Sequence, residues 1–307
     1  MITSQELALV ERALRDALSS DVDLLCTAGE LVIRSGGKRL RPTVVLLAYR
    51  ASGGQDIRQA VPLATAVELL HTASLVHDDI NDQSELRRGQ ATVNARWGSG
   101  LALLVGDFVF VRLLSLLAEC GSRAIQILGD CCTSIVEGET LQMLHQGDWH
   151  MDEALYLQIV RRKTASLFSA CGQLGAVIAG GTEEQIAALS AYGENLGIAF
   201  QIQDDTLDLV GQQEILGKPV FLDLDQGNAS LAILHALEHA KGAAEILRTG
   251  DKARVVRMLH DHGALDYAAQ KARTFAERAI SALSVLPASE ARSELRRLAD
   301  YAVIRDR

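Results

Sequence analysis

The chain has little proline, few aromatic residues and a deficit of positive charge. Only 4 of its 307 residues are proline and 4% are Phe, Trp or Tyr, whereas 48% are hydrophobic, with Leu and Ala abundant. Few helix breakers and many good helix formers favour long helices over a sheet. The formal net charge of −9 argues against a nucleic-acid-binding surface. It leaves open an anionic substrate, because a few local cations can outweigh the overall sign.

The cysteines indicate neither a disulfide framework nor a metal site. There are 5, an odd number, without metal-ligand spacing, and the adjacent pair Cys131 and Cys132 makes a poor structural disulfide. With no signal peptide at the start, we expect a reducing, cytoplasmic location. The most hydrophobic run, 101–117, contains Asp107 and Arg112 and is short for a membrane span, so we expect a buried core helix there.

Apolar residues recur at helical spacing along most of the chain. Thr3 to Glu6 forms a capping-box pattern at the start of a first helix. Residues 83–92 are polar and contain a glycine, which indicates a loop, and no segment alternates with period two. We therefore predict one all-α domain covering residues 1–307, with later helices at 61–82, 101–119, 124–144, 151–179, 183–210, 229–248, 251–262, 265–283 and 289–301.

Two aspartate clusters of identical spacing are the most informative feature of the sequence. Residues 78–82 (DDIND) and 204–208 (DDTLD) both read D-D-x-x-D, which puts the first and last carboxylates one turn apart on one helix face. A single cluster could be a solvated helix end. Two copies, each after an apolar helix, predict two walls of a metal-filled cavity, because a hard cation neutralises clustered carboxylates. The candidate ligands are Asp78, Asp79, Asp82, Asp204, Asp205 and Asp208.

Cations near these clusters indicate an anionic ligand. Residues 36–42 (GGKRLRP) form a glycine-containing turn with three positive charges, which suits a diphosphate and equally suits a solvated basic turn. Arg87 and Arg88 follow the first cluster, either as surface ion pairs or as a second anion clamp. Lys163 lies in an apolar helical stripe, where it either extends its ammonium to the surface or points into the cavity.

These motifs, taken together, resemble the trans-polyprenyl diphosphate synthases of isoprenoid chain elongation. They occur in that family's order over nearly the whole chain. The matching segments are GGKRLRP (36–42), HDDIND (77–82), RRG (87–89), GDF (106–108), KT (163–164), FQIQDDTLD (200–208) and GK (217–218).

The resemblance implies a fold, a reaction and a cofactor. The fold is the single-domain isoprenoid synthase fold, a helical bundle around a central active-site cavity, in a homodimer. The reaction is a 1′-4 trans condensation of isopentenyl diphosphate with an allylic diphosphate, giving a long polyprenyl diphosphate of the hexaprenyl to solanesyl type. The cofactor is Mg²⁺, three ions per active site, with Mn²⁺ able to substitute. A product of this length implies transient contact with a membrane surface.

The resemblance also assigns roles to residues. Lys38, Arg41, His71 and Arg88 would hold isopentenyl diphosphate, and Arg87, Lys163, Thr164, Gln201 and Lys218 would face the allylic diphosphate. Asp78, Asp82 and Asp204 are the main metal ligands, supported by Asp79, Asp205 and Asp208. The catalytic set is Asp78, Asp82, Arg87, Lys163 and Asp204.

Two small residues before the first cluster bear on product length. Ala73 and Ser74 precede Asp78 by five and four residues, ~6–7.5 Å along a helix axis. In the resembling family, bulky residues at these positions stop growth early, so small ones favour a long product. The alternative is that Ala73 and Ser74 only permit close helix packing.

One departure from the family pattern and several rival functions stay open. Asn228 stands where many relatives carry a second lysine after the second cluster, so one diphosphate contact is weakened. The rivals are a geranylgeranyl or farnesyl diphosphate synthase, a non-catalytic subunit of a heteromeric prenyl synthase, and a class I terpene cyclase. Retention of both aspartate clusters argues against the non-catalytic subunit, and a cyclase would not need the isopentenyl clamp of Lys38, Arg41 and Arg88.

Overall fold

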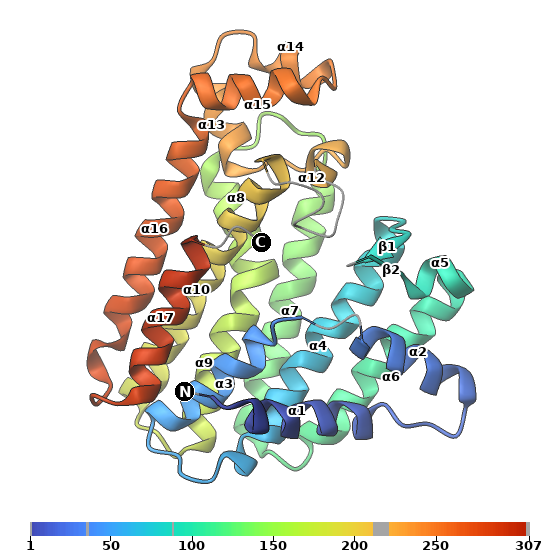
Figure 1. The fold of residues 1–307 in the computed structure, drawn as a ribbon, viewed down its shortest axis with the longest axis vertical. Helices are drawn as coiled ribbons and strands as arrows, with labels where there is room; N and C mark the ends of the chain where they lie inside the picture. The colour runs from blue at the N-terminus through green and yellow to red at the C-terminus, as the bar shows by residue number, and fades with distance from the viewer. Residues whose placement is uncertain (1, 35–36, 88, 211–220, 305–307) are drawn as a thin grey trace. The chain divides into compact units, whose positions relative to one another are not determined.

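The protein is built almost wholly from α-helices (Figure 1). The computed structural model describes residues 2–34, 37–87, 89–210 and 221–304. Within these residues the only strands form one antiparallel hairpin of β1 (Leu86–Arg87) and β2 (Gln90–Ala91). The all-α fold predicted from the composition is confirmed.

The chain divides into two compact units, each made from several segments. The first unit comprises Met1–Gly129, Ala170–Ser190 and Ser284–Leu295, and the second comprises Asp130–Ser169, Ala191–Leu283 and Arg296–Arg307. The single domain over residues 1–307 stays a prediction. Five described helices contribute residues to both units: α7 (Ser122–Leu144), α9 (Ser166–Ile178), α10 (Glu183–Val210), η3 (Leu283–Val285) and α17 (Glu290–Ile304).

The central element of the first unit is α4 (Val61–Asn81), which carries the first aspartate cluster. It packs extensively against α6 (Ser99–Leu117). Gly106 permits this close approach, since a Cβ at that position would lie 2.1 Å from Nε2 of His77. The other elements of this unit are α1 (Ser4–Ala17), α2 (Asp23–Arg34), α3 (Leu40–Ala51), η1 (Ile57–Gln59) and α5 (Val93–Trp97).

The second unit surrounds a core of buried Ala, Leu, Ile and Val side chains. The backbones of α9 and α10 meet at Gly193, where a Cβ would lie 2.1 Å from the carbonyl oxygen of Phe168. The remaining described elements of this unit, in chain order, are α8 (Glu153–Val160), η2 (Arg161–Ala165), α12 (Leu222–Asp225), α13 (Leu231–His239), α14 (Ala243–Arg248), α15 (Lys252–Asp261) and α16 (Ala264–Ala282).

The structure confirms some predicted boundaries and corrects others. The capping box of Thr3 and Glu6 begins α1 as predicted. The predicted loop 83–92 contains the β1–β2 hairpin, whose paired segments are too short to show a period-two pattern. The predicted helix 229–248 is wrong, because Gly242 adopts a left-handed conformation (φ 78°) that separates α13 from α14. The predicted helix 151–179 begins at Glu153, ends at Ile178 and contains a π-helical turn, η2.

The most hydrophobic helix, α6, is buried on one face only. By length and composition it is the one described helix that could cross a membrane. The prediction of a buried core helix therefore holds for the face that includes Ala102, Val105 and Val109. The opposite face exposes Leu103, Leu104, Val111 and Leu114.

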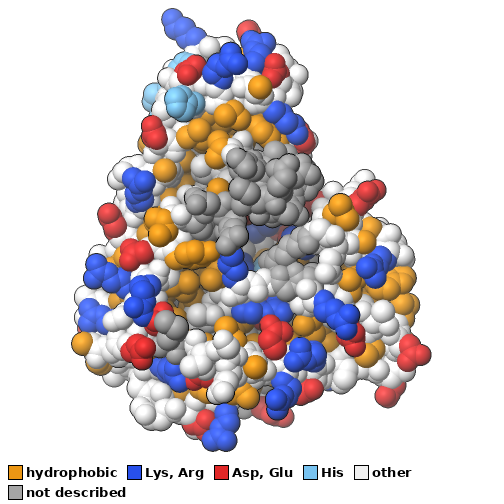
Figure 2. Space-filling model, in the orientation of Figure 1, with side chains coloured by type: hydrophobic (Ala, Val, Ile, Leu, Met, Phe, Trp, Pro, Cys, Tyr) orange, Lys and Arg blue, Asp and Glu red, His pale blue; other side chains and the backbone are white. Residues whose placement is uncertain are grey.

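Charged side chains of both signs are interspersed on the face drawn in Figure 2. Lys and Arg side chains lie among Asp and Glu side chains, with hydrophobic side chains exposed between them. The net charge of −9 is therefore not gathered into a single acidic field on the part of this face that the structure describes.

Candidate active site

The first aspartate cluster occupies the last turn of α4. The backbone N–H of Asp82 donates to the carbonyl oxygen of Asp78 (2.8 Å), so their side chains lie one turn apart on the same face. Asp78 is half-buried and Asp82 is exposed. The negative end of the helix dipole disfavours carboxylates here, and the last turn of α4 contains no basic residue. This end of α4 therefore suits a bound cation.

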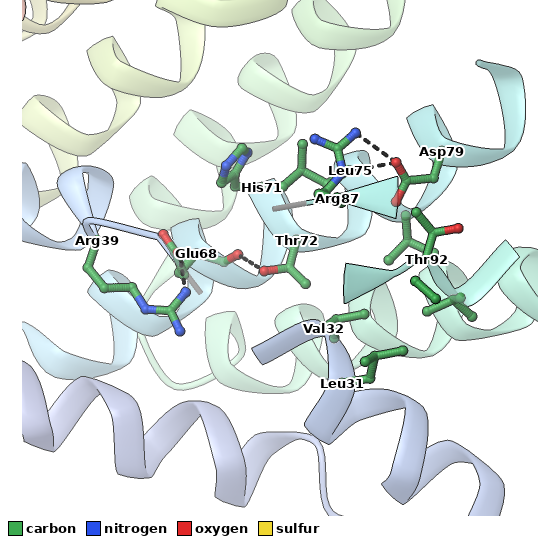
Figure 3. Close-up of a pocket in the computed structure, with 13 residues that line it drawn as sticks. Leu31, Val32, Arg39, Glu68, His71, Thr72, Leu75, Asp79, Arg87 and Thr92 are labelled. Carbon is green, nitrogen blue, oxygen red and sulfur yellow. Dashed lines mark hydrogen bonds and ion pairs between the residues drawn. The ribbon is translucent and has the colours of Figure 1, made fainter. Parts of the chain in front are cut away.

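Asp79, between these two residues, is held by the hairpin. Arg87 on β1 donates from Nε and Nη2 to Oδ1 of Asp79 at 2.9 and 2.7 Å (Figure 3). The Asp79 side chain is only 8% exposed, so the ion pair fixes the hairpin against the end of α4. Asp78 and Asp82 are consequently the better metal-ligand candidates in the first cluster.

A small cavity of about 50 Å³ lies beside this ion pair. Its polar lining includes His71, Asp79 and Arg87, and α2 contributes Leu31 and Val32 to its apolar side (Figure 3). The structure thus brings together two of the predicted diphosphate-binding residues, His71 and Arg87. Two others in the first unit, Lys38 and Arg41, are not among the described residues that line this cavity.

Arg39, the middle cation of residues 36–42, has a structural role that the sequence did not indicate. It donates from Nε to Glu11 and from Nη1 to Glu68, both at 2.6 Å, and from Nη2 to the carbonyl oxygen of Ile33 at 3.1 Å. Burial alone would lower the pKa of its guanidinium, but the hydrogen bonds and charges of Glu11 and Glu68 outweigh burial and raise it. Arg39 also has a left-handed backbone (φ 49°). The diphosphate candidates in this turn are therefore Lys38, which is exposed, and Arg41, which is half-buried.

The second aspartate cluster lies near the C-terminal end of α10, where the last turn again contains no basic residue. Asp205 accepts hydrogen bonds from Tyr156 Oη (2.6 Å) and Gln201 Nε2 (2.7 Å). Gln201 in turn accepts from the Thr164 hydroxyl at 2.8 Å. Asp208 is buried, at 1% exposed, whereas Asp204 is half-buried. Asp204 is therefore the best metal-ligand candidate of the second cluster.

A second cavity, of about 130 Å³, lies at this hydrogen-bonded group. It brings together four of the predicted site residues, Lys163, Thr164, Gln201 and Asp205, and it adds Tyr156. Lys163 and Thr164 lie in the π-helical turn η2, and π turns inside α-helices are frequent at functional sites. Lys163 also forms an ion pair with Glu139 of α7. Tyr156 was predicted only as part of an apolar stripe, because Asp205 lies 49 residues further along the chain.

The remaining predicted residues have separate positions. Ala73 is buried in α4, and the Ser74 hydroxyl donates to the carbonyl oxygen of His71 at 2.8 Å. Neither residue is among the described residues that line the two cavities, so their place in a product channel stays a prediction. Arg88 and Lys218 lie outside the described residues. The two aspartate clusters belong to different compact units, and their facing arrangement also stays a prediction.

The donor set fits Mg²⁺ if the substrate completes its coordination. Within the described residues, no group of three or more His, Cys, Asp or Glu side chains could hold a metal ion by itself. Mg²⁺ generally takes one or two carboxylates and fills its other positions with water and phosphate oxygens. The Asp78 and Asp82 pair supplies such carboxylates at a helix end that favours a cation, and Asp204 supplies a further carboxylate six residues before the end of α10.

Comparison with known proteins finds polyprenyl synthases that match nearly the whole chain. The polyprenyl synthetase family model matches residues 22–259. The octaprenyl diphosphate synthase of Haemophilus influenzae is 40% identical in sequence, and the match covers 94% of this chain and 91% of that protein. The octaprenyl diphosphate synthase of Escherichia coli K12 is 38% identical, and the match covers 100% of this chain and 98% of that protein. A polyprenyl synthase from Caulobacter crescentus CB15 is 38% identical in sequence, and its crystal structure was solved as a complex with calcium and isoprenyl diphosphate. It superposes with a TM-score of 0.95 over 99% of this chain and 95% of that one.

These matches confirm the isoprenoid synthase fold and the prenyltransferase activity that the motifs predict. The chain belongs to the polyprenyl synthetase family.

Proposed function

We propose that the protein is a metal-dependent, long-chain trans-polyprenyl diphosphate synthase. It condenses isopentenyl diphosphate with an allylic diphosphate and extends the product by five carbons per cycle. The observation that carries this proposal is the pair of aspartate clusters at helix ends, each beside a cavity that contains a cationic side chain, Arg87 or Lys163. The octaprenyl diphosphate synthases, at 38–40% identity, support a long product.

The residues provide the conditions for losing the diphosphate. When bound, Mg²⁺ would neutralise the charge that develops on a leaving diphosphate. Asp78, Asp82 and Asp204 would hold the metal, while Lys163 and Arg87 would donate hydrogen bonds to the departing oxygens. The bond between C1 and oxygen breaks, and the electron pair leaves with the diphosphate. The double bond of isopentenyl diphosphate then attacks the allylic cation, and the released diphosphate accepts the proton that is lost.

The other polar residues bind and position the substrates. Asp79, Asp205 and Asp208 support the metal ligands from buried or hydrogen-bonded positions. We expect three Mg²⁺ ions per site, with Mn²⁺ able to substitute, because several cations are needed to neutralise a diphosphate beside clustered carboxylates. Isopentenyl diphosphate binds to Lys38, Arg41, His71 and Arg88, and the allylic diphosphate binds to Arg87, Lys163, Thr164, Gln201 and Lys218.

Incubation of the purified protein with Mg²⁺, farnesyl diphosphate and labelled isopentenyl diphosphate tests the reaction. We expect label in a polyprenyl diphosphate, with a product longer than geranylgeranyl diphosphate. A product of geranylgeranyl length would instead favour a short-chain synthase. A cyclic hydrocarbon without label would favour a terpene cyclase, and no turnover of either substrate would favour a non-catalytic subunit.

Replacement of Ala73 by phenylalanine tests how product length is set. Ala73 is buried in α4, five residues before Asp78. If it borders the path of the growing tail, the introduced phenyl ring blocks the path and the main product becomes shorter by several five-carbon units. Chromatography of the dephosphorylated products measures this, with Ala64→Phe, elsewhere in α4, as the control for overpacking. An unchanged product distribution would place the tail elsewhere.

The exposed face of α6 fits a second copy of this chain. Leu103, Leu104, Val111 and Leu114 are each at least half exposed, and a contiguous apolar face of this kind marks an interface. The homodimer predicted from the resemblance would cover this face. Sedimentation velocity at micromolar concentration checks the proposal, and a monomer that remains active would contradict it.

The proposed location is the cytoplasm, with transient membrane contact when the long product leaves. The five cysteines are present as thiols rather than disulfides in the structure, which is consistent with a reducing compartment. Cell fractionation followed by immunoblotting tests this location. Recovery of the protein only after detergent extraction would contradict transient contact.

A further inference from the structure

Besides Tyr156, which donates to Asp205, the second cavity contains one titratable side chain that the proposed function does not use. His145 lines this cavity together with Lys163, Gln201, Asp205 and Asn228. It follows directly after α7, and its ring is about one-third exposed. A histidine in a predicted diphosphate site is a potential cationic donor.

Two hydrogen bonds attach the segment around His145 to the segment around Asn228. The backbone N–H of Gly147 donates to the carbonyl oxygen of Gly227 at 2.8 Å, and Gln146 Nε2 donates to that of Gln226 at 2.6 Å. The backbones approach so closely that a Cβ at Gly227 would lie 3.0 Å from the nitrogen of Gly147. His145 and Asn228, although far apart in sequence, are therefore held at the same side of the cavity.

This side of the cavity has little positive charge for a diphosphate. Among the described residues that line the cavity, Lys163 is the one Lys or Arg, and it forms an ion pair with Glu139. Asn228 is neutral, and its Nδ2 donates to Gln226 Oε1 at 3.3 Å. A diphosphate beside Asp205 therefore needs a further cationic donor from this side.

Asp148 orients the His145 ring. Nδ1 of His145 lies 3.3 Å from Oδ2 of Asp148, whose other oxygen accepts the backbone N–H of His150 at 2.9 Å. The His150 N–H first, and the His145 ring second, lower the pKa of the Asp148 carboxyl, which is therefore ionised and can only accept. Nδ1 must then carry its proton. If Nε2 also donates to a diphosphate, the ring has to be an imidazolium.

We propose that His145, as an imidazolium oriented by Asp148, binds the allylic diphosphate and supplies the positive charge that Asn228 does not. The inference rests on the proposed function, because it takes an allylic diphosphate to be the ligand of this cavity. It adds a diphosphate-binding residue that neither the aspartate clusters nor the basic motifs contain.

Calorimetric titration with inorganic diphosphate in the presence of Mg²⁺ tests the contact without requiring turnover. His145→Ala should weaken diphosphate binding about tenfold or more, the usual effect of removing a charged hydrogen bond. It should raise KM for the allylic substrate by a similar factor and change kcat by less than about threefold. His145→Gln keeps a side chain of similar reach without charge and should behave like His145→Ala.

Rescue and control variants separate binding from a purely structural role. A second substitution, Asn228→Lys, should restore most of the diphosphate affinity of His145→Ala, because it returns a cation to the same side of the cavity. His150→Ala is the matched control, since His150 is exposed and its hydrogen bond to Asp148 comes from the backbone N–H, which the substitution keeps. It should leave diphosphate binding and KM unchanged, and circular dichroism verifies that each variant is folded.

The outcomes distinguish this inference from the proposed function. Wild-type affinity for diphosphate in folded His145→Ala and His145→Gln would overturn the role of His145, as would failure of Asn228→Lys to restore affinity. If wild-type protein binds diphosphate but incorporates no labelled isopentenyl diphosphate, the proposed function fails while the binding role of His145 is still measured. A wild-type protein that binds no diphosphate would overturn both.

Discussion

Replacement of Asp78 by alanine is expected to lower turnover by about three orders of magnitude while the protein keeps its fold. Asp78 lies in the last turn of α4, on the same face as Asp82, and both are proposed metal ligands. Loss of metal-assisted charge stabilisation is typically worth several kcal/mol, and roughly 4 kcal/mol corresponds to three orders of magnitude in rate. Steady-state incorporation of labelled isopentenyl diphosphate measures the effect.

Although Asp78→Ala should lower turnover, it should not lower the thermal stability of the protein. Removing one carboxylate from the negative end of α4 relieves repulsion, so thermal unfolding should not occur at a lower temperature. Near-normal turnover in Asp78→Ala across a range of Mg²⁺ concentrations would contradict a metal-binding role.

The neighbouring residue Asp79 provides the matched control. Its side chain is buried and receives two hydrogen bonds from Arg87. Asp79→Ala should therefore lower the free energy of unfolding by about 1–3 kcal/mol, the usual cost of breaking such a contact when the partner can still reach water. Urea denaturation compares the two variants. Equal destabilisation by both substitutions would mean that the structural roles of Asp78 and Asp79 do not differ.

Replacement of Arg39 by alanine should produce the largest loss of stability. The Arg39 and Glu68 side chains are 10% and 6% exposed, and Arg39 also binds Glu11. Its removal leaves Glu68 as a buried carboxylate without its cation, and breaking a buried pair in this way costs about 3–5 kcal/mol. The midpoint of urea denaturation, with an unchanged dependence of unfolding free energy on urea concentration, checks this value.

Lys38 is the control for Arg39 in the same turn. Its side chain is exposed, so Lys38→Ala should change the free energy of unfolding by less than about 0.5 kcal/mol. It should instead raise KM for isopentenyl diphosphate, to which Lys38 is proposed to bind. The roles assigned to the two cations would be wrong if Lys38→Ala were unstable. They would also be wrong if Arg39→Ala were stable but defective in substrate binding.

The local features of this protein could be predicted from neighbouring residues alone. The capping box at Thr3 and the helical stretch that ends in Asp78 and Asp82 depend on contacts three or four residues apart. The same is true of the Gln201 and Asp205 contact, which joins positions four residues apart on α10. Helical periodicity therefore predicted these elements. It missed the short hairpin and the π turn, because the sequence pattern of side chains does not distinguish them from a loop or a continuous α-helix.

The sequence by itself determined an all-α protein with two acidic helix ends and several nearby cations, because composition and local spacing decide helix formation and which side chains share a face. Only the tertiary structure decided which of these charged groups have structural roles. Arg39 pairs with Glu11 and Glu68, Arg87 with Asp79, and Tyr156 with Asp205, across separations of 8 to 49 residues. Such pairings depend on how helices pack, and that packing comes from the fit of the whole core, which local periodicity does not specify.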